Sequence, residues 1–185
     1  EKITIHPLVK LLWEAGVQYE HKVIESLKKE NPGKTFCEID PKAPASETLA
    51  EKTVAAMQNG AGFIYQGVLM AENKIGRPDL LVKAAGKSSL GDHFYYPIDI
   101  KLARVDGTWD DGNEKLNLEY LWQLHFYADL LEKIQGTRPP DGYIYKTKSR
   151  QMHVNLFKTP KKYREALNLL EAYLNGDPKE SEAAI

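Results

Sequence analysis

Cysteine is almost absent from this chain of 185 residues, and long apolar runs are missing altogether. A single cysteine, Cys37, excludes a disulfide framework and any iron–sulfur cluster or Cys-type zinc site made by this chain alone. It is typical of a reducing compartment, so we expect a cytoplasmic protein in which Cys37 is a small core residue. No apolar run approaches the length that spans a bilayer and no signal peptide opens the chain, so we expect no membrane partner.

A strong charge bias is also missing, since 25 Lys and Arg stand against 26 Asp and Glu, a net charge of −1. Broad polyanion-binding surfaces are usually basic, so this balance is mild evidence against tight, non-specific binding of nucleic acid. Positive charge is nevertheless clustered at Lys146, Lys148 and Arg150, beside a predicted strand. Such a cluster is more often a solvated face than a binding site, and a basic rim for DNA is the other interpretation.

The length is that of one domain with a full core, and no repeat or low-complexity tract divides it. We expect a single domain over residues 1–176 and a polar tail over 177–185. Because the first residue is Glu1, we expect a domain cut from a longer protein or a chain whose disordered start was removed. Gly-rich phosphate loops and nucleophile elbows are absent, which leaves a small-molecule α/β enzyme without support.

Apolar spacing predicts helices, three strands, a helix, further strands and a last helix, the order of a mixed α/β domain. A break is expected in the first helix at Gly16, and a capping box of Thr48 and Glu51 is expected to open the second. The expected helices cover residues 8–30, 48–58, 116–134 and 160–175. The expected strands cover residues 35–39, 63–70, 76–84, 95–103, 143–146 and 153–157. Strong β-formers stand at both odd-numbered and even-numbered positions of these strands, which predicts a sheet covered on both faces.

Two acids stand inside runs of β-forming apolar residues, Asp79 and Asp99. A buried carboxylate without a partner is costly, so each calls for a cation or a hydrogen-bond donor. Asp99 and Lys101 are two residues apart and therefore point to the same face of a strand. If the Asp79 strand lies beside them, the three groups form the minimum set for metal-assisted hydrolysis of a phosphodiester. Taken alone, the Asp99–Lys101 spacing is more often a cross-face ion pair on an edge strand.

Four ordered segments make the arrangement more specific. They are Ile64–Gly67, Gly76–Leu81, Pro97–Ala103 and Gln123–Leu131. Together with the succession of three strands, a crossover helix and a further strand, they resemble the RecB-like branch of the PD-(D/E)xK nucleases. That branch includes CRISPR-associated adaptation exonucleases and RecB-family putative nucleases. The resemblance covers residues 8–150 and implies an α/β fold with a restriction-endonuclease-like core, a central mixed β-sheet flanked by helices.

The resemblance also implies a role for each residue of the two acid segments. Asp79 and Asp99 would bind Mg²⁺ or Mn²⁺, with the carbonyl of Ile100 as a third ligand, and Lys101 would be the catalytic lysine. Asp99 stands where Glu is commoner, a variation that the motif allows. The implied activity is that of a metal-dependent deoxyribonuclease, more specifically an exonuclease, in DNA repair, recombination or defence. The implied partners are DNA and a fused or associated helicase or other nucleic-acid-processing domain.

Gln123 and Tyr127 are four residues apart and share one face of their expected helix. The resemblance implies that this pair lies beside the active site and helps to hold the lysine or the DNA. The spacing of Tyr127 with Leu124 and Leu131 fits a core residue equally well. Both interpretations of Tyr127 stay open.

The first helix departs from the family pattern at Tyr19. The family carries a Gly-x-x-His-Glu start there, and its metal-binding histidine aligns with Tyr19, a poor ligand because a phenol has a pKa near 10. Glu20 remains and can approach the metal directly or through water. His21 is turned about 100° from Glu20 around the helix. A site made of oxygen ligands alone favours Mg²⁺ over softer metals.

Two functions are therefore open for this chain. The first is a metal-dependent deoxyribonuclease. The alternative is a catalytically weakened nuclease-fold module that binds nucleic acid or a partner protein, with Tyr19 as the mark of decay. The presence of Asp79, Asp99 and Lys101 favours the first, because buried charges are costly to keep once a metal is lost. The remaining histidines have no ligand-like spacing and are expected to be structural; they are His6, His93, His125 and His153.

Overall fold

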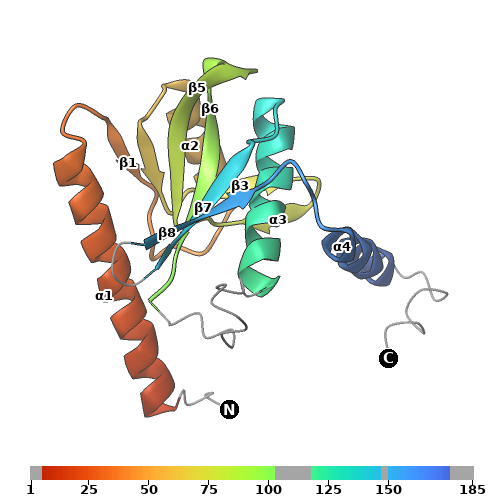
Figure 1. The fold of residues 1–185 in the computed structure, drawn as a ribbon, viewed down its shortest axis with the longest axis horizontal. Helices are drawn as coiled ribbons and strands as arrows, with labels where there is room; N and C mark the ends of the chain where they lie inside the picture. Colours follow the sequence, from red (N-terminus) through yellow and green to blue (C-terminus); the bar gives the residue numbers. More distant parts are fainter. Residues whose placement is uncertain (1–5, 103–117, 147–149, 176–185) are drawn as a thin grey trace.

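The computed structural model describes residues 6–102, 118–146 and 150–175. This part of the chain forms a mixed six-stranded sheet flanked by helices (Figure 1). The helices are α1 (Pro7–Glu30), α2 (Glu47–Gln58), α3 (Leu118–Gln135) and α4 (Lys161–Leu174). The strands are β1 (Phe36–Glu38), β2 (Phe63–Tyr65), β3 (Leu69–Ala71), β4 (Lys74–Gly76), β5 (Leu80–Ser88), β6 (Gly91–Ile100), β7 (Asp141–Lys146) and β8 (Arg150–Asn155). The predicted α/β class with a mixed central sheet is confirmed.

The central sheet has the strand order β1-β2-β5-β6-β7-β8, and β3 pairs with β4 in a separate two-stranded sheet. Strands β2, β5 and β6 form an antiparallel meander. The β6–β7 pair is parallel, and a parallel pair needs a crossover connection, which contains α3 here. The end of β6 therefore lies between the start of β5 and the end of β7.

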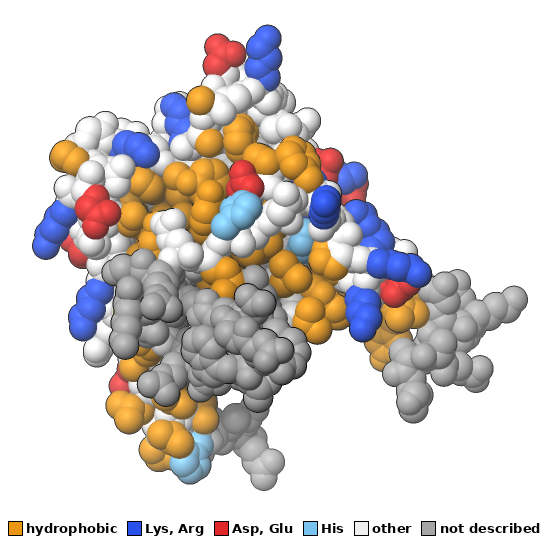
Figure 2. All heavy atoms as spheres, viewed as in Figure 1, with side chains coloured by type: hydrophobic (Ala, Val, Ile, Leu, Met, Phe, Trp, Pro, Cys, Tyr) orange, Lys and Arg blue, Asp and Glu red, His pale blue; other side chains and the backbone are white. Residues whose placement is uncertain are grey.

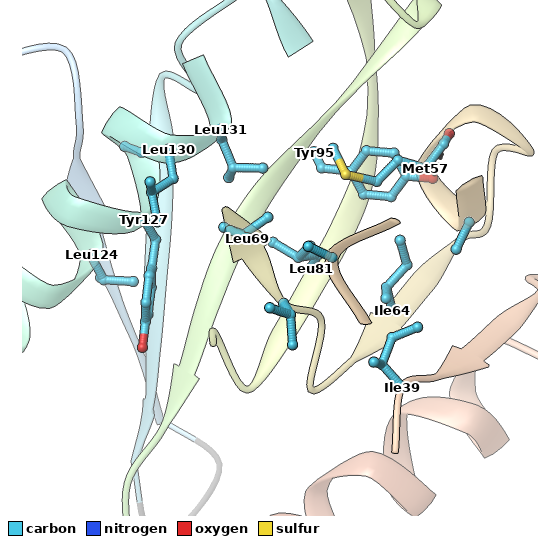
Figure 3. Packing of buried hydrophobic residues seen from close by; sticks show 14 of the residues in the cluster. Ile39, Met57, Ile64, Leu69, Leu81, Tyr95, Leu124, Tyr127, Leu130 and Leu131 are labelled. Carbon is cyan, nitrogen blue, oxygen red and sulfur yellow. Dashed lines mark hydrogen bonds between the residues drawn. The ribbon is translucent and has the colours of Figure 1, made fainter. Parts of the chain in front are cut away.

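Apolar side chains cover both faces of this sheet, as the β-formers at odd-numbered and even-numbered positions predicted. On one face α1 packs Ile24 and Leu27 against even-numbered residues of β5 and β6, among them Leu80 and Ile98. On the other face α2 and α3 pack against a larger cluster (Figure 3). Its labelled members are Ile39, Met57, Ile64, Leu69, Leu81, Tyr95, Leu124, Tyr127, Leu130 and Leu131. No helix among the described residues combines the length and the apolar composition needed to cross a bilayer.

Two expectations about the helices are wrong. Helix α1 runs through Gly16 without a break, because one glycine in a helix interior costs only about 1 kcal/mol and the flanking residues sustain the helix. Its start is fixed by the His6 imidazole, which accepts a hydrogen bond from the Leu8 N–H at 3.2 Å. Helix α2 begins at Glu47 after Ser46, without a side-chain cap, so the predicted capping box at Thr48 is not formed.

Two long expected strands are each interrupted. The run 63–70 is split after Tyr65 because Gln66 adopts a positive φ of 54°, which ends the extended backbone. The run 76–84 is split at Pro78, which has no N–H to donate to a ladder. The strand β8 lies three residues earlier than expected at its start. These interruptions place Gln66 and Asp79 side by side at one end of the sheet, where the Gln66 N–H donates to the Asp79 carbonyl at 3.0 Å.

Candidate active site

Asp79 directly precedes β5, and Asp99 lies in β6, the antiparallel neighbour of β5. Leu80 is the register partner of Ile98, and one further step along this ladder brings position 79 opposite position 99. Directly opposite residues of an antiparallel pair project from the same face. The Ile100 N–H donates to Asp79 Oδ2 at 2.7 Å, which holds this carboxylate against the end of β6. The structure therefore brings the two predicted acids together on the face that α3 covers.

Lys101 forms a close ion pair with Asp99. Its Nζ lies 3.0 Å from Oδ1 and 2.9 Å from Oδ2, and 5.2 Å from the ring centre of Tyr120 on α3. Asp99 is 1% exposed, whereas the Lys101 side chain is 24% exposed. Within the described residues, Asp99 Oδ2 has no hydrogen bond of good geometry, although Nζ is near. A buried carboxylate oxygen in this state has a free lone pair for a cation.

The cluster holds more negative than positive charge. Burial raises the pKa of Asp79 well above its ordinary value, and the charges of Asp99 and Glu20 raise it further, while the Ile100 N–H and Lys101 oppose the rise. Burial is the largest single effect and lowers the pKa of Lys101, but attraction and hydrogen bonding to Asp99, together with the charges of Asp79 and Tyr120, outweigh it and the pKa is raised. With Asp79 ionised, three carboxylates and one ammonium leave an excess equal to the charge of one divalent cation.

Glu20 reaches this cluster through Gln66. Gln66 Nε2 donates to Glu20 Oε1 at 2.5 Å and to Asp79 Oδ1 at 3.3 Å. The Tyr65 hydroxyl is also hydrogen-bonded to Glu20, and burial together with the Glu20 charge raises the pKa of Tyr65. Within the described part of the chain, no three His, Cys, Asp or Glu side chains converge closely enough to hold a metal by themselves.

Tyr127 is a core residue, as one of its two interpretations predicted. It is 5% exposed in the core beside Leu124 (Figure 3). Its hydroxyl accepts from Gln123 Nε2 at 2.7 Å and donates to the carbonyl of Arg77 at 3.1 Å. In these contacts the Gln123–Tyr127 pair fixes the backbone two residues before Asp79. A role in holding Lys101 or DNA stays a prediction.

The sequence alone did not indicate that Gln66 and Arg77 belong to the site. Gln66 belongs to a segment that carries the family resemblance, but nothing in its neighbourhood signals a positive φ. Arg77 donates from Nη1 to the carbonyl of Ala43 at 3.0 Å and so ties the approach to Asp79 to the loop after β1. Its partner lies 34 residues earlier in the chain, so no local pattern could have indicated this bond.

The remaining predicted residues are Tyr19 on α1 and the basic cluster of Lys146, Lys148 and Arg150. Tyr19 is partly buried and lines a cavity of about 260 Å³ with Tyr145 and Gln151, and burial raises its pKa. Lys146 and Arg150 are register partners at the ends of β7 and β8. Lys148 lies outside the described residues.

A groove of about 700 Å³ opens beside Glu20 and Gln66. Its further lining includes Trp13, His21 and Lys42, from α1 and the loop after β1. The Trp13 side chain is 67% exposed, and the apolar side chains of the first half of α1 gather at the lower end of the view in Figure 2. The groove therefore runs from the exposed side chain of Trp13 to Glu20 and Gln66.

Comparisons with known proteins give no family for this chain. Neither a scan against protein-family models nor a search of curated proteins found a match. The functional assignment therefore rests on the geometry and chemistry of the cluster around Asp79, Asp99 and Lys101.

Proposed function

We propose that this chain is a Mg²⁺- or Mn²⁺-dependent phosphodiesterase of the RecB-like branch of PD-(D/E)xK nucleases, and that it hydrolyses the DNA backbone. The observation that carries the proposal is the position of Asp79 opposite Asp99, with Lys101 paired to Asp99. The buried Asp99 Oδ2 without a well-directed hydrogen bond supports it, because hard divalent cations prefer carboxylate oxygen. The excess negative charge of the cluster supports it as well, since a divalent cation would neutralise that charge.

Asp79 and Asp99 would hold the cation, with the carbonyl of Ile100 as a further oxygen ligand. When bound, such an ion polarises a phosphate and lowers the pKa of water. Lys101 contributes a fixed positive charge, because its pKa is raised and the side chain stays protonated at neutral pH. An ammonium beside a phosphate stabilises the negative charge that develops during the displacement. Asp99 orients this ammonium through contacts with both of its carboxylate oxygens.

The groove beside Glu20 is an argument that DNA reaches the cluster as a single strand. Aromatic side chains bind unpaired bases by stacking, whatever the sequence. Trp13 offers such a surface, and Lys42, from the loop after β1, offers a positive charge for a phosphate. The bases would lie along Trp13 while the backbone enters the site.

The test is a cleavage assay with single-stranded, double-stranded and closed circular DNA. Cleavage is expected with Mg²⁺ or Mn²⁺ and is expected to stop in EDTA. Lys101→Met provides the inactive control, since it keeps the length of the side chain and removes its charge. Degradation of linear but not circular DNA would establish action from strand ends. Binding of oligonucleotides without any cleavage would overturn the proposal in favour of the weakened nucleic-acid-binding module.

A further inference from the structure

We propose that Gln66 is a positioning residue through which Glu20, on one face of the sheet, fixes the carboxylate of Asp79 on the other. This inference rests on the proposed function in so far as Asp79 holds a cation. The faces follow from the packing: α1 lies against the even-numbered residues of β5 and β6, whereas Asp79 and Asp99 share the odd-numbered face with Leu81. Glu20 therefore needs an intermediary at the end of the sheet.

The side-chain amide of Gln66 matches its two neighbours in number and kind. An amide nitrogen carries two hydrogens, and Nε2 has one carboxylate oxygen at 2.5 Å from Glu20 and one at 3.3 Å from Asp79. The opposite orientation would turn the amide oxygen toward two carboxylates, so the acceptors dictate which atom faces them. The shorter bond to Glu20 holds the amide, and the amide then holds Asp79.

The backbone is held by hydrogen bonds at Gln66 and at Val68. The Gln66 N–H donates to the carbonyl of Asp79 at 3.0 Å, and the Val68 N–H donates to Thr53 Oγ1 at 2.9 Å. Between them, Gly67 is packed so closely that an added Cβ would meet Leu81 and Thr53 at 3.1 Å. Gln66 itself has a φ of 54°, a conformation in which glycine or asparagine is the usual residue. A glutamine at this position supplies a long amide that those residues lack.

The consequence for Asp79 is that both of its oxygens are held, Oδ2 by the Ile100 N–H and Oδ1 by Gln66. Each oxygen keeps a lone pair, in a fixed direction. Because the amide is neutral, it orients the carboxylate without the competition for a cation that an ammonium would bring. Glu20 acts through Gln66 in this arrangement and need not bind the cation itself.

The test measures Mn²⁺ affinity by calorimetry on the whole chain, beside thermal unfolding in EDTA. Gln66→Met keeps the side-chain length without donors, and Gln66→Gly relieves the positive φ. Both are expected to weaken Mn²⁺ binding about 10- to 100-fold, the usual effect of removing a group that orients a ligand. Gln66→Gly should leave the melting temperature in EDTA unchanged or raise it. Asn73→Gly is the matched control, because Asn73 also has a positive φ, 60°, in the β3–β4 turn, and its Mn²⁺ affinity should not change.

Glu20→Ala separates an indirect from a direct role of this carboxylate. Alone it should weaken Mn²⁺ binding as Gln66→Met does, and in the Gln66→Met background it should add no further loss. A further tenfold loss in the double variant would overturn the inference, since Glu20 would then bind the cation directly. Unchanged affinity in both Gln66 variants would overturn it while leaving the nuclease proposal intact. Gln66-dependent Mn²⁺ binding without DNA cleavage would support it and overturn the nuclease proposal alone, and absence of Mn²⁺ binding by the wild type would overturn both.

Discussion

Asp99 has two partners under the proposed function, the ammonium of Lys101 and a divalent cation. Both are attracted to one carboxylate that is 1% exposed. Lys101 is the more exposed member of the pair and can shift toward solvent or a phosphate when a cation binds. The two residues should therefore affect metal binding in opposite directions, although both are required for cleavage.

We expect Lys101→Met to abolish most cleavage and to tighten Mn²⁺ binding. The lost charge stabilisation should lower the cleavage rate about 10²- to 10³-fold, the usual effect of removing one such group. Mn²⁺ binding should tighten several-fold because the competing ammonium is gone. Single-turnover cleavage and calorimetry measure the two effects separately.

Asp99→Asn is the matched change on the other side of the ion pair. It keeps the volume of the side chain, so the core stays filled, and it should lose both Mn²⁺ binding and cleavage. Relief of repulsion with Asp79 offsets part of the lost ion pair, so the free energy of unfolding in EDTA should change by no more than about 1–2 kcal/mol. Wild-type cleavage by Asp99→Asn would show that the activity lies elsewhere.

The shared face of Asp99 and Lys101 was predictable from the sequence, because side chains two apart on a strand always share a face. The role of Gln66 was not predictable, since it depends on a positive φ and on the docking of α1, whose Glu20 lies 46 residues earlier. The hydrogen bond of Arg77 was not predictable for the same reason, because its partner is remote in sequence. Local periodicity therefore predicts which side chains share a face of a strand. It does not predict the contacts between distant segments that orient those side chains.

At the scale of elements, α3 and α4 are joined by a partly buried polar network. His125 on α3 is 1% exposed, and its ring centre lies 5.7 Å from that of Tyr163 on α4. The Tyr163 hydroxyl donates to Asp129 at 2.6 Å, and Arg138 binds the same carboxylate at 2.5 Å. Burial, and next the nearby Arg138 charge, lower the pKa of His125 to about 4. The helix junction therefore requires a neutral imidazole.

This requirement predicts a loss of stability in mild acid. The pKa of His125 is near 6.5 in the unfolded chain and about 4 in the fold, so only the unfolded state takes up a proton between these values. Its contribution is fully present above pH 6.5 and falls as the pH drops toward 4, by on the order of 3 kcal/mol. His125→Phe keeps a ring against Tyr163 and removes the titration. Urea unfolding at several pH values should show a weaker pH dependence in the variant, and an equal dependence would contradict the prediction.

Helix α1 supplies one wall of the groove, and Trp13 is its largest exposed aromatic side chain. If unpaired bases stack there, Trp13→Ala should weaken binding of a single-stranded oligonucleotide by about 1–3 kcal/mol, the usual contribution of one stacked base. Binding in Ca²⁺ or EDTA, followed by fluorescence anisotropy of the oligonucleotide, measures this without cleavage.

Leu12→Ala is the control for Trp13. Leu12 is 61% exposed on the same helix but does not line the groove, so its loss should leave oligonucleotide binding unchanged. Equal losses in the two variants would point to a general effect on α1 and would contradict the stacking prediction.

The element boundaries show where periodicity misleads. The run 63–70 was expected to be one strand because most of its residues are apolar β-formers, but the chain turns at Gln66 and continues into the β3–β4 hairpin. The expected break at Gly16 failed for the opposite reason, since the modest cost of one glycine is offset along the rest of α1. Turns that depend on a single backbone angle leave little trace in composition.

For the whole molecule, the excess negative charge at the site links cation binding to folding. At a cation concentration 100 times the dissociation constant, the free energy of unfolding should rise by about 2.7 kcal/mol. For a chain of this size that corresponds to a rise of about 5–10 °C in the melting temperature. Differential scanning calorimetry with Mg²⁺, Mn²⁺ and EDTA measures it. Asp79→Asn should abolish the shift, and an equal shift in that variant would place the cation elsewhere.

For the molecule as a whole, the α/β class and the burial of both faces of the sheet were predictable. The positions of β-formers and the helical spacing, from which they follow, are properties of each segment. The assembly of the site was not. Asp79 meets Asp99 only because β5 and β6 pair in one register, and a shift by one residue would turn one acid to the opposite face.

The packing of α1 has one more consequence. Only Ile24 and Leu27 of this helix are buried, so its first half has little to hold it and should exchange its amide hydrogens through local opening. The β5–β6 amides, buried in the centre of the sheet, should exchange only on global unfolding. Glu20 lies between the fast-exchanging half of α1 and the slowly exchanging sheet, and it is joined to the sheet by the Gln66 amide and the Tyr65 hydroxyl. Slower exchange around residue 20 on cation binding would therefore report, amide by amide, how firmly the helix is coupled to the sheet.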